Sequence, residues 1–533
     1  MKKKILIEKG IFIPTAVILL GVILFGFLFN DIFNSVMTML FNLVTDWTGW
    51  FMMIGSFVMV VACFVVCFTP LASKKVGGPD AKVEHPVFSW CAMAICSGIA
   101  TAVVFYAVGE PITYFHNTPT WWNIASETPE AVVRSVSQAQ FHWGFIYYGI
   151  FTFWGLISGY MIHNHNLPPR PSSAFYPILK DKIFGTWGKV IDVLSLLALI
   201  GGMVTSLGFG VQQFASGLDY VFGLKPSNLI YIITLLLVTA SYTLSSGRGI
   251  KKGMAMISNI NAYIYIFLII FLFFMGDTVF EFKLLTASLG EQITNFIPNI
   301  FSLDPCNEGQ GWFQGWTVFY MAWITAYAPL IGCFLAKISK GHTWRSYILV
   351  NILVPAAFVT IWFVAFGGNA IYQDMFNNAG IGAEVVEKGI PIANFALLNH
   401  MPLKSITIPI VVAALFFSFI TLADAMTGTI SAITVKNMDE DEAPVRIKFF
   451  WGILCGASTF LCLFCLGESG TTSLQNMSIV YSLPIFILTF ASIPALWKMC
   501  NGTVDKEIAE LSDEERLKLT GAVPAVVEAV SEE

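Results

Sequence analysis

Charged side chains are scarce in this sequence: Asp, Glu, Lys and Arg together make up only 12% of its 533 residues. A water-soluble domain carries about 25% charged residues, so the chain lacks about half of the charge that a soluble surface needs. Apolar residues instead reach 56%, and the mean hydropathy is +0.71. These proportions exclude a soluble enzyme and predict an all-α protein that crosses a membrane many times.

Clusters of metal-binding or catalytic residues are also scarce. Eight of the ten cysteines fall in apolar runs, where a small, soft side chain is an ordinary packing choice. His163 and His165 form the only close histidine pair, with no acidic residue in the same loop. We therefore expect no enzymatic activity, no cofactor and no metal site.

Apolar stretches long enough to span a bilayer recur along the chain. The first has no small-residue cleavage site, so we interpret it as a retained helix rather than a signal peptide. The sequence predicts twelve transmembrane helices, at 11–30, 49–69, 88–110, 139–162, 190–212, 228–244, 258–276, 316–336, 346–366, 407–434, 448–466 and 477–497.

Lys and Arg are distributed unevenly between these helices. Of the 29 Lys and Arg residues, 24 fall in alternate segments that include both termini, and five fall in the segments between them. Short loops rich in Lys and Arg stay on the cytoplasmic side. We therefore predict a multi-pass protein of the cytoplasmic (inner) membrane with both termini in the cytoplasm.

Two of the predicted helices are disturbed at corresponding positions. The helix at 88–110 contains Gly98 and ends in Gly109-Glu110-Pro111, and the helix at 316–336 contains Pro329. Each is the first of a group of five helices, and disrupted helices at matching positions indicate a transporter site. Because each group has an odd number of helices, the second group must enter the membrane from the opposite side. The two groups then form an inverted repeat.

The predicted domains are two N-terminal helices in 1–70, a first repeat in 88–276, an outer segment with an amphipathic interfacial helix in 277–315, a second repeat in 316–497 and a short cytoplasmic tail in 498–533.

Aromatic side chains gather on two of these helices. The residues concerned are Trp143, Tyr148 and Phe151 on one helix, and Trp316, Tyr320, Trp323 and Tyr327 on one face of another. Such a stripe more often serves helix packing than binding. Rings without a partner carboxylate would, however, suit a quaternary ammonium ion, which cation–π attraction holds without hydrogen bonds.

Ionisable residues within the predicted helices are few. Asp424 lies well inside its helix, and Glu110 and Asp192 lie near helix ends. A carboxylate within the membrane is a functional candidate, and for Asp424 two roles stay open: an ion- or proton-linked role, or a structural hydrogen bond. His142 has no obvious acidic partner in the sequence, so we expect it to be structural.

Several long motifs resemble the betaine/choline/carnitine transporter family, and the resemblance runs from about residue 10 to 497. They are WTVFYMAWITAYAPLIGCFLAKISKGHTWRSYILVNILVPAAFVTIWFVAFGG, QFHWGFIYYGIFTFWGLISGYMIH, LPPRPSSAFYPILKDKIFGTWGKVIDVLSL and GGMVTSLGFGVQQ. The resemblance implies twelve helices with a leucine-transporter-type inverted repeat, a homotrimer in the lipid bilayer, and glycine betaine, carnitine, butyrobetaine or choline as substrate. It implies no nucleic-acid partner.

The resemblance also implies a binding box. The family's box maps onto Trp143, Tyr148 and Phe151, and onto Trp323, after which Ile324 stands where the family has another ring. Tyr114 and Tyr327 match rings of carnitine-type members. The box is therefore incomplete, and the individual substrate stays open.

The coupling residues depart from both family types. Sodium-driven members carry Thr-Ser before Ala-Asp, whereas this chain has Thr421-Leu422-Ala423-Asp424, and their Gly-rich run is here Gly98-Ile99-Ala100-Thr101-Ala102. The Thr-Leu pair resembles the sodium-independent carnitine exchangers, although these carry Arg at the position of Ala255 and Met at that of Ile331. We expect sodium-independent exchange. Sodium- or proton-coupled symport is the alternative, and a membrane sensor or channel a distant one.

Overall fold

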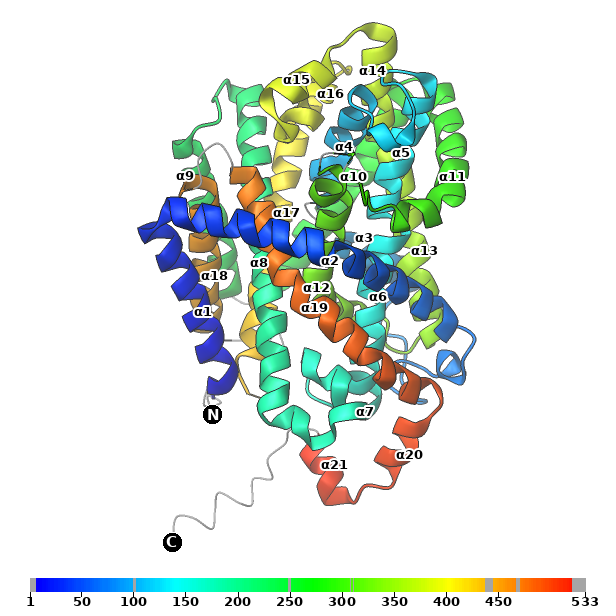
Figure 1. Cartoon of the computed structure of the whole chain (residues 1–533), viewed down its shortest axis with the longest axis vertical. Coiled ribbons are helices and arrows are strands. Elements are labelled where there is room, and N and C mark those ends of the chain that lie inside the picture. The colour runs from blue at the N-terminus through cyan, green and yellow to red at the C-terminus, as the bar shows by residue number, and fades with distance from the viewer. Residues whose placement is uncertain are drawn as a thin grey trace.

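The computed structural model describes residues 6–98, 102–247, 251–306, 308–309, 311–436, 444–465 and 470–519, and its regular structure is helical. Within these ranges the β-type contacts are two isolated bridges. The helices form a tall bundle (Figure 1). They are α1 (Lys9–Leu28), α2 (Asn30–Val66), α3 (Val87–Gly98), α4 (Val104–His116), α5 (Pro129–Trp143), α6 (Phe145–Gly159), α7 (Tyr176–Leu179), α8 (Thr186–Phe222), α9 (Asn228–Gly247), α10 (Lys251–Met275), α11 (Thr278–Phe301), α12 (Phe319–Ile338), α13 (Trp344–Phe363), α14 (Asn369–Asn377), α15 (Ile381–Lys388), α16 (Ala393–Asn399), α17 (Lys404–Ile433), α18 (Val445–Phe460), α19 (Gly470–Cys500), α20 (Thr503–Ala509) and α21 (Asp513–Leu519).

Nine helical runs of the described residues are long and apolar enough to cross a membrane. A tenth forms if α10 and α11, which meet at 113°, count as one bent span. The prediction of an all-helical, multi-pass membrane protein is confirmed. Each of the twelve predicted segments overlaps helix, but the number of crossings and the inverted repeat stay predictions.

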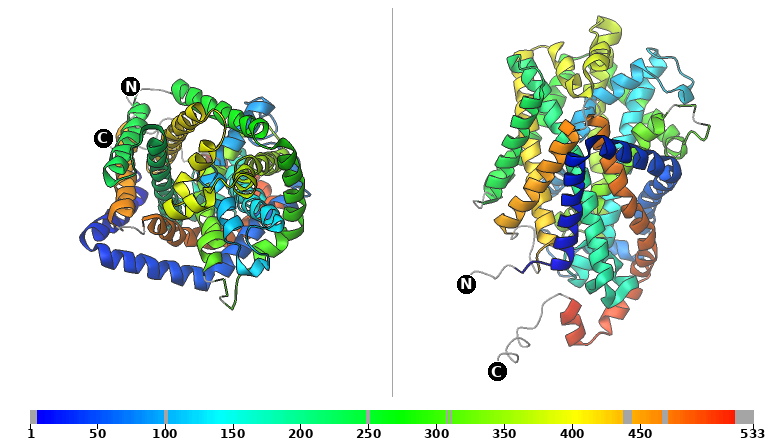
Figure 2. Two further views of the ribbon diagram at one scale, coloured as in Figure 1. Left: turned by 90° about the horizontal axis from the view of Figure 1, so that it is seen from above. Right: turned by 60° about the vertical axis from the view of Figure 1, so that its left-hand side comes forward.

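The segment that joins the first two predicted helices is helical rather than a loop. Only Phe29 separates α1 from α2, and α2 already begins at Asn30. In the first turns of α2, Phe33 and Met37 are buried while Ile32 and Met39 are exposed, so one face packs on the bundle. The twelve predicted helices left residues 31–48 as a loop, because this stretch is less apolar than a membrane-spanning helix. That expectation was wrong, since the whole stretch is helical. Seen from above, α2 runs along the edge of the molecule (Figure 2).

At the centre of the bundle, α6 and α12 approach each other closely. A Cβ at Gly155 of α6 would lie 2.2 Å from the backbone oxygen of Gly332 in α12. A Cβ at Gly332 would in turn lie 2.3 Å from the backbone nitrogen of Gly155. Small residues allow such close helix contacts in membranes, and this contact places the aromatic faces of the two helices side by side.

The C-terminal helices are held against the bundle. α1 begins at the same end of the molecule at which α20 and α21 lie (Figures 1 and 2). Asp505 of α20 accepts hydrogen bonds from Lys74 and from the Tyr160 hydroxyl at 2.5 Å, and it lies 3.1 Å from His165. Burial alone would raise the pKa of Asp505, but the bonds from Lys74 and Tyr160 outweigh it and lower that pKa. The first part of the tail is therefore docked rather than freely solvated.

Candidate functional site

Trp143 stands at a break between two helices. α5 ends at Trp143, α6 begins at Phe145, and Gly144 between them has φ −94° and ψ −119°. A Cβ at Gly144 would lie 2.5 Å from the backbone oxygen of Gln140, so the break requires glycine. The sequence predicted one continuous helix here. The break leaves the Trp143 side chain fully buried among other rings.

Four rings from three helices form what we call the aromatic cluster: Tyr106 of α4, Trp143 of α5, and Tyr320 and Trp323 of α12. The Trp143 centroid lies 4.6 Å from that of Tyr320 and 6.1 Å from that of Trp323. Tyr106 lies 5.6 Å from Trp143 and 5.0 Å from Tyr320. The structure thus brings three predicted site residues together with Tyr106, which the sequence did not single out.

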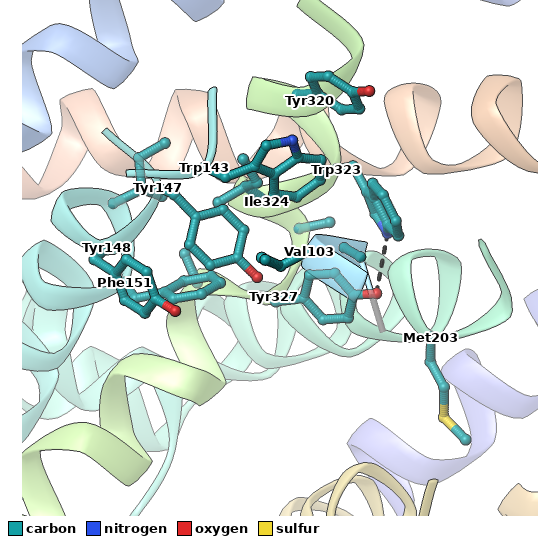
Figure 3. Packing of buried hydrophobic residues seen from close by; sticks show 14 of the residues in the cluster. Val103, Trp143, Tyr147, Tyr148, Phe151, Met203, Tyr320, Trp323, Ile324 and Tyr327 are labelled. Carbon is teal, nitrogen blue, oxygen red and sulfur yellow. Dashed lines mark hydrogen bonds between the residues drawn. The ribbon is translucent and has the colours of Figure 1, made fainter. Parts of the chain in front are cut away.

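Hydrogen bonds to α8 fix the orientation of the α12 rings. The Trp323 indole N–H donates to the Tyr327 hydroxyl at 3.0 Å (Figure 3). That hydroxyl donates to the backbone oxygen of Gly202 at 2.7 Å and also contacts Ser206. These bonds occupy the polar atoms of Trp323 and Tyr327 and hold the two rings in a fixed orientation relative to α8.

A small cavity of about 30 Å³ lies next to Tyr327. This volume takes about two water molecules, so a larger ligand requires the surrounding side chains to move. None of the described side chains that line it is charged. They are Ser97, Gly98, Ala102, Tyr147, Phe151, Ser206, Tyr327, Ile331, Leu422 and Met426. Trp143, Trp323 and Ile324 do not line the cavity, although Figure 3 shows all three in the same group of side chains as Tyr327, which does.

Two tyrosines of α6 satisfy backbone oxygens at the end of α3. The Tyr147 hydroxyl donates to the backbone oxygen of Gly98 at 2.7 Å, and that of Tyr148 to Ile95 at 3.3 Å. The start of α4 is held by Asn394, whose side-chain amide donates to the backbone oxygen of Val104 at 2.6 Å. Freed carbonyls within a membrane need such partners. The sequence assigned Tyr148 to the site but missed Tyr147, which lies between Phe151 and Tyr327 in Figure 3.

Glu110 and His142 form a fully buried pair beside the aromatic cluster. Glu110 Oε1 lies 2.5 Å from His142 Nδ1, and Glu110 Oε2 accepts the indole N–H of Trp143 at 2.7 Å. All three side chains are completely buried. The expectation that His142 lacks an acidic partner was wrong, because α4 and α5 bring together residues 32 positions apart.

Two predicted site residues belong to an adjoining group of rings, the outer cluster, which meets the aromatic cluster where the Trp316 centroid lies 5.9 Å from that of Tyr320. Tyr114 lies 5.0 Å from Trp316, 5.4 Å from Trp312 and 5.8 Å from Trp122. Tyr114 lies in α4 and Trp316 lies just before the start of α12, and neither lines the cavity.

The residues expected to act in coupling are only partly brought together. Gly98 and Ala102 line the cavity, whereas Ala100 and Thr101 lie outside the described residues. The Thr421 hydroxyl donates to backbone oxygens of its own helix, those of Phe417 and Ser418, both at 3.0 Å. The Thr421 hydroxyl is thus bonded within α17, and a role for Thr421 in coupling stays a prediction. Asp424 is half-buried on the same helix.

Known proteins give matches over nearly the whole chain. Residues 10–504 match the model of the BCCT, or betaine/carnitine/choline, family of transporters. A probable glycine betaine transporter of Desulfitobacterium hafniense is 33% identical over 90% of this chain and 94% of its own length. An ectoine/hydroxyectoine transporter of Virgibacillus pantothenticus is 29% identical over 92% and 96%. A high-affinity choline transport protein of Escherichia coli is 29% identical over 90% of this chain and 70% of its own length.

Proposed function

The chain belongs to the betaine/carnitine/choline transporter family, and from this premise we propose that it moves small trimethylammonium compounds across the cytoplasmic membrane by alternating access. The substrate class comprises glycine betaine, carnitine, butyrobetaine and choline. Relatives named for glycine betaine and for choline support this class. The observation that carries the proposal is the uncharged, ring-lined cavity beside the aromatic cluster.

The ring geometry supports a cation site. Phe151 and Tyr327 line the cavity, and Trp323 adjoins it through its bond to Tyr327. A trimethylammonium group has no N–H to donate, so it is held by ring faces rather than by hydrogen bonds. Each ring face contributes about 0.5–2 kcal/mol to its binding by cation–π attraction. Because the cavity holds only about two water molecules, the structure corresponds to a closed form, and substrate entry requires α12 or α17 to shift.

We further propose the finer architecture that the family suggests. It comprises twelve crossings, an inverted five-helix repeat after two additional helices, both termini in the cytoplasm and a homotrimer. The shared end of α1 and α20 supports termini on one side. The break at Gly144 gives a discontinuous helix close to Tyr147, which lines the cavity, as expected for a transporter site.

For coupling we propose sodium-independent exchange of substrates. Leu422 faces the cavity with an apolar side chain, and the Thr421 hydroxyl is bonded within its own helix. A hard cation such as sodium needs several oxygen ligands, which these two residues do not offer. Symport with sodium or protons is the alternative.

Counterflow in proteoliposomes tests the proposal. Vesicles preloaded with unlabelled choline, glycine betaine or carnitine are diluted into each labelled compound, with and without sodium, and proline serves as a control solute. We expect rapid exchange of at least one trimethylammonium compound in both buffers and none of proline. Exchange that requires sodium would contradict the coupling mode, and absence of exchange for every compound would contradict the function.

A further inference from the structure

The Glu110–His142 pair is built to take up a single proton. His142 Nδ1 lies 2.5 Å from Glu110 Oε1. An ionised carboxylate can only accept, so Nδ1 then carries the shared hydrogen and the exchangeable position is the other ring nitrogen, Nε2. When Nε2 is deprotonated, the neutral imidazole and the carboxylate together carry one negative charge. With Nε2 protonated, the pair is neutral overall. Because both side chains are completely buried, the uncompensated negative charge is costly.

The surroundings of Nε2 can accommodate either state. Nε2 lies 3.0 Å from the Thr317 hydroxyl and 3.1 Å from the side-chain nitrogen of Gln138. A hydroxyl donates or accepts according to its rotation, and an amide offers its oxygen instead of its nitrogen when it flips. The Gln138 side-chain oxygen is buried and has no hydrogen-bond partner among the described residues. A protonated Nε2 would therefore find acceptors without any helix moving.

The charged groups around the pair are few. The titratable side chains that face Glu110 are tyrosines: Tyr106 and Tyr114 of α4 and Tyr320 of α12. The hydroxyls of Tyr114 and Tyr320 are buried and without a hydrogen-bond partner in the part of the chain that the structure describes. Arg134 lies two turns before His142 and is bonded to Glu291 and Asn299. No Lys or Arg of the described residues forms an ion pair with Glu110 or His142.

One side chain connects this pair to the rings. Trp143 donates its indole N–H to Glu110 Oε2 at 2.7 Å, and its ring lies 4.6 Å from Tyr320 and 6.1 Å from Trp323. A cation held on these ring faces is thus separated from the carboxylate by a single indole. The unprotonated pair attracts such a cation, and a proton on the pair removes that attraction.

We propose that the Glu110–His142 pair is a proton-binding site, and that a proton there and the quaternary ammonium group of the substrate compete for one negative charge. The proposal rests on the proposed function, since it concerns the same substrate at the same rings. Binding of substrate then releases a proton, and the affinity for substrate rises with pH.

Calorimetric titration of the purified full-length protein with choline measures this competition directly. Choline has no titratable ammonium proton, so any proton exchanged comes from the protein. Titrations in two buffers of different ionisation enthalpy give the number of protons released. We expect release of protons at about pH 6 and choline binding that is fivefold or more tighter at about pH 8.

Variants assign the proton to the pair. In Glu110→Gln the amide still accepts the Trp143 N–H and donates to His142, but the negative charge is gone. We expect weaker choline binding that is independent of pH and releases no proton, and the same loss of proton release in His142→Gln. Glu281→Gln is the matched control, because Glu281 is another fully buried carboxylate, bonded to Asn369 at 2.8 Å, and should behave as the unmodified protein.

Two results would overturn the inference: choline binding to the unmodified protein with equal affinity at both pH values and no proton release, or proton release that persists in Glu110→Gln. Failure of choline, glycine betaine and carnitine to bind at either pH would instead contradict the proposed function. The two failures are distinguishable because the first requires that binding be observed.

Discussion

Trp143 takes part in two kinds of contact at once. Its ring packs on Tyr320 and Trp323, while its N–H bonds to Glu110. Trp323 is similar, with its ring in the cluster and its N–H bonded to Tyr327. Both indoles thus have satisfied polar atoms, so a cation without hydrogen-bond donors that enters the cluster would contact only their rings.

Replacing Trp323 tests the role of its ring. We expect Trp323→Leu to weaken choline binding by about 1–2 kcal/mol, because one cation–π partner is removed. The matched control is Trp362→Leu, which removes a fully buried indole that stacks on Phe366 at 4.2 Å instead. Binding measured by calorimetry should be unchanged in the control. Equal losses of affinity in the two variants would mean that the effect is general destabilisation.

His116 connects α4 to neighbouring segments through both ring nitrogens. Nε2 lies 2.8 Å from Asp374 of α14, and Nδ1 lies 2.7 Å from Glu127. The bond with Asp374, followed by that with Glu127, raises the pKa of His116. The folded-state pKa is therefore above the unfolded one, so the stabilisation is complete below the ordinary histidine pKa and is lost as the pH rises through the raised value.

We expect the unfolding temperature of the detergent-solubilised protein to fall as the pH rises above the ordinary histidine pKa of about 6.5 and through the raised pKa of His116. This decrease should be smaller in His116→Gln, which cannot become charged. His400→Gln replaces an exposed histidine and serves as the control. A His116→Gln profile that follows the unmodified protein at every pH would refute the contribution of this contact.

At the scale of helices, the packing of α3 against α6 depends on Gly98. A Cβ there would lie 2.6 Å from Tyr147 Cε1 and 2.7 Å from the Tyr148 hydroxyl. These are the two tyrosines that bond to the end of α3. A side chain at this position must therefore displace the two tyrosines that bond to α3.

We expect Gly98→Ala to reduce the rate of exchange in counterflow at least severalfold, because Tyr147 also lines the cavity. Gly21→Ala is the control: Gly21 lies in α1 with no atom within 4 Å of its Cβ position, and alanine favours a helix over glycine. Unaltered exchange by Gly98→Ala protein of normal stability would show that the tyrosines tolerate displacement.

The sequence predicted the helices well and their contacts poorly. Hydropathy locates helices because burial in lipid requires long apolar runs. It does not reveal the break at Gly144, which depends on one backbone conformation, or the pairing of Glu110 with His142, which depends on how α4 packs on α5. Ile324 illustrates the same limit. It was predicted to face the site, but the side chain is fully buried and does not line the cavity.

At the scale of the whole molecule, the charge distribution predicts that 277–315 is outside the cell. Cys306 in this segment is exposed, so a membrane-impermeant maleimide should label it in intact cells. Cys306→Ser should remove the label, and Gly290→Cys, with open space around the new side chain, should restore it. Labelling at these positions only after the cells are opened would reverse the predicted orientation.

The central claim is that a trimethylammonium group binds beside the aromatic cluster, and an experimental structure with bound glycine betaine tests it most directly. We expect ligand density in an enlarged form of the cavity, with the ammonium group within about 6 Å of the ring centroids of Phe151, Trp323 and Tyr327. Density found only in the outer cluster at Tyr114 and Trp316, with the cavity closed and empty of ligand, would contradict the account.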